Sequence, residues 1–223
     1  MVIINDSDTS SSNNYNFKFE LEHFQRHAIQ SINNRHNTLI TAHTGSGKTL
    51  PAEYAIEKFV SEGKRVIYTS PIKSLSNQKY NDFVNKFPDI SFGLITGDII
   101  CNPYAQCLIM TTEILRNSLF ENKMSEKANN MFEMDYNEEL GCIIYDEIHY
   151  INDVDRGRVW EESIMLTPPD CLLVMLSATI SKIDAFAKWI EATTHTVLEI
   201  CPTDKRIVPL EHYHYICAPE SAI

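Results

Sequence analysis

Short apolar runs recur along the chain at intervals typical of strands in an α/β protein. Six strands are expected, at residues 37–42, 65–70, 91–96, 107–112, 141–146 and 171–178. None of these runs alternates apolar and polar residues, and continuous runs are typical of strands buried on both faces of a sheet. Between them lie segments with helical character, the clearest being 182–190, where apolar residues recur at one-turn spacing. The pattern predicts one doubly wound α/β domain, with a mostly parallel sheet and helices on both faces.

Two segments fall outside this pattern. Residues 1–16 are rich in serine, asparagine and aspartate, and we expect a disordered polar tail there. Residues 121–139 are polar and lack apolar periodicity, so we expect a loop or a short insertion. The folded domain is therefore expected to begin at Phe17.

The composition is typical of a globular intracellular protein. At 223 residues the chain can form one sizeable domain, or at most two small ones. No apolar stretch approaches the roughly 20 residues that cross a bilayer, and the N-terminus lacks the features of a secretory signal. The six cysteines show no metal-binding spacing and are expected to be reduced core thiols. The net charge of −11 argues against a surface that is basic throughout, but it is compatible with a local basic groove.

Residues 39–56 contain the clearest candidate site. Their sequence, LITAHTGSGKTLPAEYAI, leads from an apolar strand through a glycine-rich loop into a helix, which is the context of a P-loop. Ala42 stands where the general pattern has its first glycine. Pro51 falls in the first turn of the helix, where its missing N–H has no partner to lose. An ordinary Gly/Ser turn is the alternative, and the surrounding strand and helix make it much the weaker one.

Each residue of this loop has an expected role in binding a nucleotide. Gly45 and Gly47 allow the backbone N–H groups to face a phosphate, and the following helix adds its positive end. Lys48 is expected to reach the β- and γ-phosphates, and the Thr49 hydroxyl to ligate Mg²⁺. The predicted nucleotide-binding loop consists of His43, Thr44, Gly45, Ser46, Gly47, Lys48 and Thr49.

The run CIIYDEIH, residues 142–149, begins as a core strand and ends in two adjacent carboxylates with no basic residue beside them. Ligands of open α/β sheets bind at the carboxyl ends of strands, where Asp146 is expected to hold the metal with Thr49. Glu147 is expected to orient the attacking water, and with Lys48 these acids form the predicted catalytic set. Their positive partner is expected to be Mg²⁺. A helix N-cap followed by a first-turn acid is the alternative.

Together these motifs resemble the superfamily 2 helicases of the DExH type, and specifically the Ski2-like group of RNA helicases. The resemblance extends from Phe17 to about Tyr213. Its most specific part is DEIHYINDVDRGRVWEE, residues 146–162, which continues well beyond a generic DExH box and is similar to the Ski2/Mtr4-type helicases. The resemblance implies a RecA-like P-loop NTPase domain over residues 17–205, with ATP and Mg²⁺ as cofactors.

Further segments resemble other helicase motifs. FELEHFQ, residues 19–25, resembles the Q-motif region, which implies that Phe19 stacks on adenine and that Gln25 hydrogen-bonds its edge. RIVPLEHY lies within the last stretch, 206–223, and resembles the connection to a second RecA-like domain. The motifs of that second domain are absent from the sequence, so we expect the chain to be the first half of a helicase motor.

Three residues are expected to couple nucleotide state to nucleic-acid binding. LSATI resembles motif III and supplies Ser177 and Thr179. His149 is the third, and the resemblance implies a link from the metal site to the nucleic acid. A hydrogen-bonded histidine packed under the sheet edge is the alternative for His149.

The remaining motif-like segments carry residue types suited to phosphate oxygens. TSPIKSLSNQKY, ITGD and MTTEILRNSL resemble the strand-binding elements of the group, and two of them open helices. The predicted nucleic-acid contacts are Pro71, Lys73, Asn77, Gln78, Thr96, Gly97, Asp98, Thr111, Thr112 and Arg116. Helix caps and solvated surface charges are the alternatives. Contacts of this kind carry no sequence information. The resemblance implies single-stranded RNA as the partner, bound independently of its sequence.

The leading interpretation is the N-terminal ATPase domain of an ATP-dependent RNA helicase. The resemblance also implies a place in an RNA-decay or RNA-processing complex, without separating cytoplasm from nucleus, and no membrane partner. A DNA helicase or translocase of the same superfamily is one alternative. A catalytically silent nucleic-acid-binding scaffold with a RecA fold is another, although intact Lys48, Thr49, Asp146 and Glu147 argue against it.

Overall fold

An eight-stranded sheet forms the centre of the structure, a computed structural model that describes residues 17, 19–124, 134–203, 211, 213 and 214. The strands are β1 (Asn37–Ala42), β2 (Arg65–Ser70), β3 (Phe92–Ile95), β4 (Ile100–Cys101), β5 (Cys107–Thr111), β6 (Leu140–Tyr145), β7 (Leu172–Ser177) and β8 (Leu198–Thr203). Their order across the sheet is β4-β3-β5-β2-β6-β7-β1-β8, and neighbours are parallel except for the antiparallel pair β3 and β4. The six expected strands are confirmed, each within one residue of its expected bounds.

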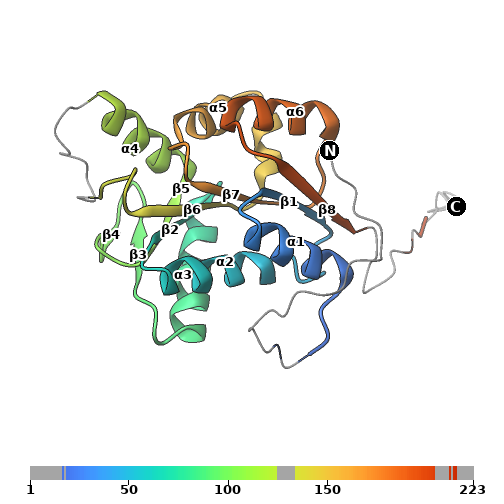
Figure 1. The fold of residues 1–223 in the computed structure, drawn as a ribbon, viewed down its shortest axis with the longest axis horizontal. Helices are drawn as coiled ribbons and strands as arrows, with labels where there is room; N and C mark the ends of the chain where they lie inside the picture. The colour runs from blue at the N-terminus through green and yellow to red at the C-terminus, as the bar shows by residue number, and fades with distance from the viewer. Residues whose placement is uncertain (1–16, 18, 125–133, 204–210, 212, 215–223) are drawn as a thin grey trace, which may run out of the picture.

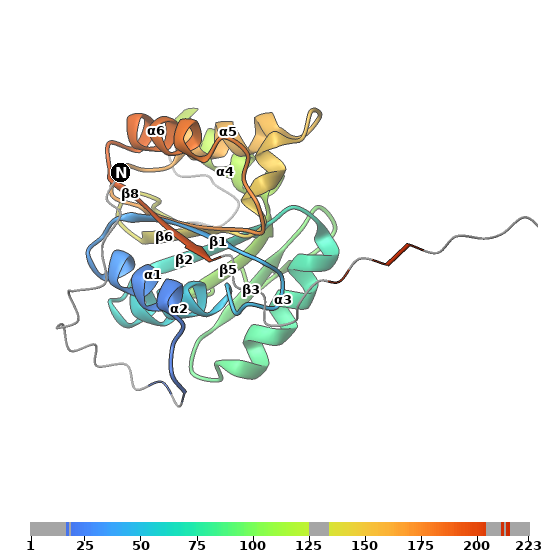
Figure 2. The same cartoon turned by 90° about the vertical axis from the view of Figure 1, so that its right-hand side faces the viewer.

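Helices cover both faces of the sheet (Figures 1 and 2). On one face lie α1 (His23–Asn33), α2 (Leu50–Ser61) and α3 (Lys73–Lys86), and on the other α4 (Thr112–Met124), α5 (Gly157–Leu166) and α6 (Ile183–Thr194). A 3₁₀ turn, η1 (Ile148–Asn152), follows β6. Helix α6 confirms the helix expected at 182–190 and continues four residues further. None of the described helices combines the length and the apolar character needed to cross a bilayer.

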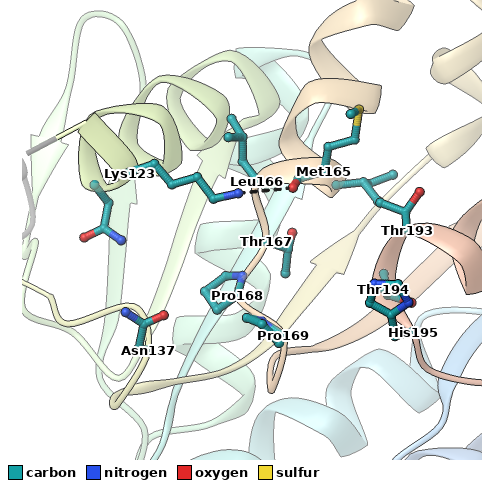
Figure 3. Close-up of a pocket in the computed structure, with 12 residues that line it drawn as sticks. Lys123, Asn137, Met165, Leu166, Thr167, Pro168, Pro169, Thr193, Thr194 and His195 are labelled. Atoms are coloured by element: carbon teal, nitrogen blue, oxygen red, sulfur yellow. Dashed lines mark hydrogen bonds between the residues drawn. The ribbon is translucent and has the colours of Figure 1, made fainter.

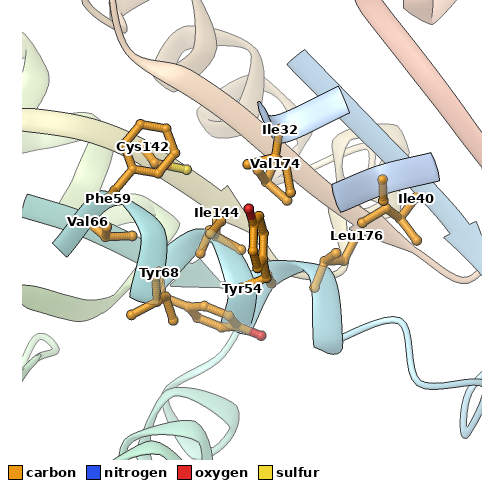
Figure 4. Packing of buried hydrophobic residues seen from close by; sticks show 14 of the residues in the cluster. Ile32, Ile40, Tyr54, Phe59, Val66, Tyr68, Cys142, Ile144, Val174 and Leu176 are labelled. Carbon is orange, nitrogen blue, oxygen red and sulfur yellow. The ribbon is translucent and has the colours of Figure 1, made fainter. Parts of the chain in front are cut away.

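Each face of the sheet has its own hydrophobic core. Tyr68, Ile144 and Val174 point toward α1, α2 and α3 (Figure 4), while their neighbours in sequence point to the opposite core. Successive side chains of a strand alternate between faces, so a strand with two covered faces needs apolar residues at every position. This double burial explains why the six predicted runs show no polar alternation.

The segment 121–139 differs from the expected loop at both of its described ends. Helix α4 continues to Met124, and Met134 and Tyr136 are completely buried against the core that α4, α5 and α6 cover. The Tyr136 hydroxyl shares a hydrogen bond with the Ser118 hydroxyl, and burial raises the pKa of Tyr136 to about 12. The apolar residues of this segment follow neither a helical nor a strand period, so the sequence pattern does not reveal that Met134 and Tyr136 are buried. Residues 125–133 lie outside the described part of the chain.

The other domain boundaries remain predictions. The described sheet ends at Thr203, close to the expected domain end at residue 205. The expected tail at 1–16 and most of the expected connection at 206–223 lie outside the described residues. The five described cysteines are free thiols, and four are buried as expected, but Cys101 is exposed on β4.

A buried carboxylate ties the first helix to the last strand. Glu199 of β8 is only 3% exposed, and its oxygens lie 3.1 Å from His27 Nε2 and 2.5 Å from His36 Nδ1. His27 belongs to α1, while His36 directly precedes β1. Because a buried carboxylate is stable only with hydrogen-bond or charge partners, this contact fixes α1 against the edge of the sheet.

Candidate nucleotide site and strand-binding groove

Apart from Phe19 and Gln25, the predicted site residues lie at or after the carboxyl ends of six neighbouring strands. The P-loop follows β1, the paired acids follow β6, and Ser177 ends β7 between them. The predicted nucleic-acid contacts follow β2, β3 and β5 on the other side of β6. Parallel strands end at one edge, so the topology gathers motifs that are far apart in the sequence.

The P-loop takes a conformation that requires glycine. Gly45 and Gly47 have φ angles of +83° and +81°, in the region that favours glycine. A side chain at position 47 would also bring its Cβ within 2.7 Å of Gln25 Nε2. The Ser46 hydroxyl donates to the His43 carbonyl oxygen over 2.6 Å and closes the turn, while Thr44 is exposed.

Gln25 holds the P-loop from the side of α1. Its Nε2 donates to the Gly47 carbonyl oxygen over 3.1 Å, and its Oε1 accepts from the Glu22 backbone N–H over 3.0 Å. Gln25 is therefore part of the site, but much of its hydrogen-bonding capacity is used within the protein. Phe19 is 57% exposed, with its ring centroid 6.2 Å from that of Phe17. The adenine contacts of Phe19 and Gln25 stay predictions.

Lys48 and Glu147 form an ion pair at the centre of the site. Lys48 Nζ lies 2.8 Å from Glu147 Oε1, and the two side chains are only 10% and 26% exposed. Glu147 has φ +55°, a left-handed conformation that is unfavourable for a residue with a side chain and that often occurs at functional sites. Lys48, which lies far away in sequence, thus gives Glu147 a positive partner in addition to the expected Mg²⁺.

Asp146 is almost completely buried at the tip of β6. It is 3% exposed, its backbone N–H donates to the Thr69 carbonyl oxygen over 2.9 Å, and its Oδ2 accepts from the Tyr68 hydroxyl over 2.6 Å. Burial raises the pKa of Asp146, whereas the Tyr68 hydrogen bond and the positive charge of Lys79 oppose that rise. Tyr68 was not predicted as a site residue, since nothing in the sequence shows that β2 lies beside β6.

The donor set fits Mg²⁺. Thr49 and Asp146 supply a hydroxyl and a carboxylate, the oxygen ligands that Mg²⁺ prefers. Within the described residues, no group of three or more His, Cys, Asp or Glu side chains could hold a metal by itself. A site with few protein ligands is typical of Mg²⁺ that is bound together with substrate phosphates.

The three predicted coupling residues lie close to these acids in the chain or in the sheet. His149 Nδ1 lies 3.3 Å from Glu147 Oε2 without hydrogen-bond geometry. This nitrogen atom is buried and has no hydrogen-bond partner among the described residues, although the His149 side chain as a whole is 34% exposed. No hydrogen bond of the His149 ring is seen among the described residues, and its coupling role stays a prediction. Ser177 is completely buried and donates to the carbonyl oxygen of Thr179, whose side chain is exposed.

Four of the predicted nucleic-acid contacts line one groove of about 340 Å³. The groove is bounded by Pro71, Ile72, Lys73, Gly97, Thr111, Glu113, Ile114 and Arg156, and we call it the strand-binding groove. Lys73 forms an ion pair with Asp98 at its rim, so the predicted contact Asp98 already balances a lysine. Thr96 is 4% exposed beside this rim.

The other predicted contacts are less accessible or lie outside the groove. Thr112 is completely buried, and its hydroxyl lies 3.0 Å from that of Thr69, so the predicted role of its side chain needs correction. The Asn77 Oδ1 is buried without a hydrogen-bond partner among the described residues, whereas Gln78 is exposed. Arg116 Nε lies 3.5 Å from Glu162 Oε2.

A separate cavity of about 450 Å³ lies at the opposite edge of the sheet, where α4, α5 and α6 end (Figure 3). Lys123, Pro168 and His195 are among its lining residues, and Lys123 Nζ donates to the Met165 carbonyl oxygen over 3.5 Å. No predicted site residue lines this cavity, which therefore takes no part in the nucleotide site.

Comparison with known proteins agrees with this geometry. Residues 22–186 match the family described as DEAD/DEAH box helicase. The chain belongs to the DEAD/DEAH box helicase family. Among curated DEAD/DEAH-type relatives, the exosome RNA helicase MTR4 of Homo sapiens is 47% identical over 197 residues, which is 88% of this chain and 18% of that protein. The antiviral helicase SKI2 of Saccharomyces cerevisiae is 45% identical over 193 residues, 86% of this chain and 14% of that protein.

The chain thus spans less than a fifth of the length of these helicase relatives. A solved structure of the DUF1998 helicase MrfA bound to DNA superposes with a TM-score of 0.67 at 19% identity, covering 82% of this chain and 27% of that one. The likeness confirms the RecA-like helicase fold, and the sequence matches confirm the resemblance to the Mtr4 and Ski2 type.

Proposed function

We propose that this chain is the ATP-binding RecA-like domain of an ATP-dependent RNA helicase of the Mtr4 and Ski2 type. The observation that carries the proposal is the 2.8 Å pair of Lys48 and Glu147, which unites a P-loop with a DExH box. The strand-binding groove opens at the same edge of the sheet. Both predicted sites therefore lie at the same edge of this domain's sheet.

The roles of the side chains follow from their charges and positions. Lys48 would bind the β- and γ-phosphates, while Thr49 and Asp146 would hold Mg²⁺, which would neutralise negative charge on the phosphates. As Lys48 turns to the phosphates, Glu147 loses its partner and becomes free to orient a water molecule and accept its proton. In this scheme the ion pair keeps the base occupied until nucleotide arrives.

The substrate we propose is single-stranded RNA, held through its sugar–phosphate backbone. The groove presents Lys73 and a glycine, and its arginine and glutamate pair with each other, which favours contacts to the backbone and binding independent of sequence. The names of the relatives, exosome RNA helicase and antiviral helicase, support a role in intracellular RNA decay or processing. A second RecA-like domain of the full-length protein would complete the ATPase site with an arginine finger.

Nucleotide and nucleic-acid measurements test the proposal. The chain should bind a fluorescent ATP analogue with Mg²⁺, and Lys48→Ala should weaken this binding at least about 100-fold, as expected for losing a buried phosphate contact.

ATPase activity of the full-length protein should be stimulated by polyuridine RNA more strongly than by polydeoxythymidine. Residues 1–223 alone should turn over poorly, because an arginine finger contributes ~10³–10⁵ in rate. Binding that ignores Lys48→Ala would refute the ATPase proposal, and equal stimulation by DNA would favour the translocase alternative.

A further inference from the structure

The turn that follows the DExH box has a single well-defined geometry. Asp153 Oδ1 accepts hydrogen bonds from the backbone N–H groups of Asp155 and Arg156, over 3.0 and 2.9 Å. The Gly157 N–H donates to the Asp153 carbonyl oxygen over 2.9 Å. A Cβ at Gly157 would lie 2.3 Å from the Ile151 carbonyl oxygen, so only glycine fits. The side chain that this turn presents is that of Arg156.

Arg156 joins two walls of the strand-binding groove. Its Nη2 donates to the Pro71 carbonyl oxygen, at the start of one predicted nucleic-acid segment. Its Nε and Nη2 donate to Glu113 Oε1 over 3.2 and 2.5 Å, in the first turn of α4. The planar guanidinium, with several donors in fixed directions, can satisfy both acceptors at once.

A second ion pair links the same two segments with the charges exchanged, the arginine now lying on α4 and the glutamate on α5. Arg116 of α4 lies 3.5 Å from Glu162 of α5, which also accepts from Arg158 over 2.7 Å. Arg116 of α4 thus pairs with a glutamate of α5, while Arg156, which directly precedes α5, pairs with a glutamate of α4. The Arg156 and Glu113 side chains are 35% and 39% exposed, and ion pairs at such exposure add little to stability. Stability alone does not explain a guanidinium with this many directed contacts.

We propose that Arg156 is a positioning residue that sets the shape of the strand-binding groove from the nucleotide side. Only η1 and the Asp153 turn separate the paired acids from Arg156 in the chain. The Arg156 guanidinium in turn hydrogen-bonds to Pro71 and to Glu113 at the start of α4. A change in the backbone after the paired acids moves the guanidinium, and with it the separation of the two groove walls. This inference rests on the proposed function, since it assigns the coupling of that same nucleic-acid site.

Two substitutions of Arg156 and one matched control test the inference in the full-length protein. Arg156→Gln removes the positive charge and the planar set of guanidinium donors. Arg156→Lys keeps the charge but offers a single ammonium group for two separated acceptors. Arg35→Gln is the control, because it removes another arginine–glutamate ion pair, with Glu62, on the α1 and α2 side of the sheet. The readouts are the dissociation constants for fluorescein-labelled polyuridine RNA and for a fluorescent ATP analogue with Mg²⁺, together with the melting temperature.

Arg156→Gln should weaken RNA binding about 10-fold or more while changing nucleotide affinity less than about twofold. Arg156→Lys should fall between this variant and wild type, and Arg35→Gln should bind RNA normally. If Arg156→Gln does not fold, the lysine variant decides the matter by the same comparison. Wild-type RNA affinity in the variants, or equal losses for RNA and nucleotide, would overturn the inference. A wild-type protein that binds no RNA would instead overturn the proposed function.

Discussion

Lys48 Nζ lies 2.8 Å from Glu147 Oε1, an ion pair that joins the P-loop to the DExH box across 99 residues of chain. Both groups are mostly buried, so each loses a partner in a poorly solvated site if the other is removed. Nucleotide phosphates must compete with Glu147 for the lysine. The free energy of nucleotide binding in this domain therefore includes the cost of separating the pair.

Removing the carboxylate charge of Glu147 should separate binding from turnover. Glu147→Gln is expected to bind the ATP analogue with Mg²⁺ at least as tightly as wild type, because Lys48 no longer has to leave a carboxylate. Turnover by the full-length protein should fall about 10²–10⁴-fold, as expected for the loss of a general base. Steady-state ATPase and fluorescence binding assays measure both effects, with the exposed Glu138→Gln as control. Hydrolysis at the normal rate in Glu147→Gln would show that Glu147 is not the base.

Alanine at Gly47 should damage the nucleotide site more than the backbone strain alone explains. Gly47→Ala places a Cβ at φ +81° and within 2.7 Å of Gln25 Nε2. Gly63→Ala is a matched control, since Gly63 has φ +75° but nothing within 4 Å of the added Cβ. Both variants should lose about 1–2 kcal/mol of unfolding free energy in urea titrations. Only Gly47→Ala should lose nucleotide affinity, by about 10-fold or more. Comparable losses of nucleotide affinity in the two variants would contradict this prediction.

The hydroxyl of Tyr68 should matter for the Mg²⁺ requirement. Tyr68→Phe removes the 2.6 Å hydrogen bond to Asp146 Oδ2 and leaves the ring in place. The Mg²⁺ concentration for half-maximal binding of the ATP analogue should rise about 10-fold, in the range found for partners of metal ligands. Tyr145→Phe is the control, because that hydroxyl donates to Ser163 over 3.1 Å in the opposite core. An unchanged Mg²⁺ titration in Tyr68→Phe would mean that Asp146 needs no such support.

Tyr136 should make the free energy of unfolding of the domain fall at alkaline pH. Burial raises the pKa of Tyr136 to about 12, against an ordinary value of 10.0, so its contribution to stability is complete below pH 10 and is lost as the pH rises toward 12. Tyr136→Phe should cost about 1 kcal/mol near neutral pH through its hydrogen bond to Ser118. By about pH 11 the wild type loses about 1.4 kcal/mol from this group, so the two proteins should become similar in stability.

Urea unfolding across this pH range measures the difference. The exposed Tyr104→Phe serves as the control, and it should track the wild type at every pH. A difference between Tyr136→Phe and wild type that stays constant from neutral to alkaline pH would show that Tyr136 ionises equally easily in the folded and unfolded states.

The strands were predictable where burial is uniform. β1 and β2 match their expected bounds because both faces of the sheet are covered, which leaves continuous apolar runs. β4 and β8 were missed. The two residues of β4 are exposed, and β8 lies at the sheet edge, where it accommodates a buried glutamate and a proline that interrupt any apolar pattern.

The site was predictable where its residues are contiguous in sequence. The P-loop and the pair of acids are each contiguous motifs with a recognisable residue spacing. Lys48 and Glu147 are therefore predictable from the sequence without knowledge of the fold. Tyr68 is not, because its role depends on β2 lying beside β6. Thr112 shows a different limit: a hydroxyl at a helix start looks the same in sequence whether it faces a ligand or bonds to Thr69 in the core.

The contact between His27 and Glu199 has a consequence for how the domain is made. The two residues are 172 positions apart, and β1 lies between β7 and β8, both of which come late in the chain. A ribosome must therefore release almost the whole domain before the first helix finds its partner, and contacts of such long range slow folding. Until β7 and β8 emerge, β1 lacks both of its partner strands. The part of the site that is translated first becomes one of the last to be fixed in place.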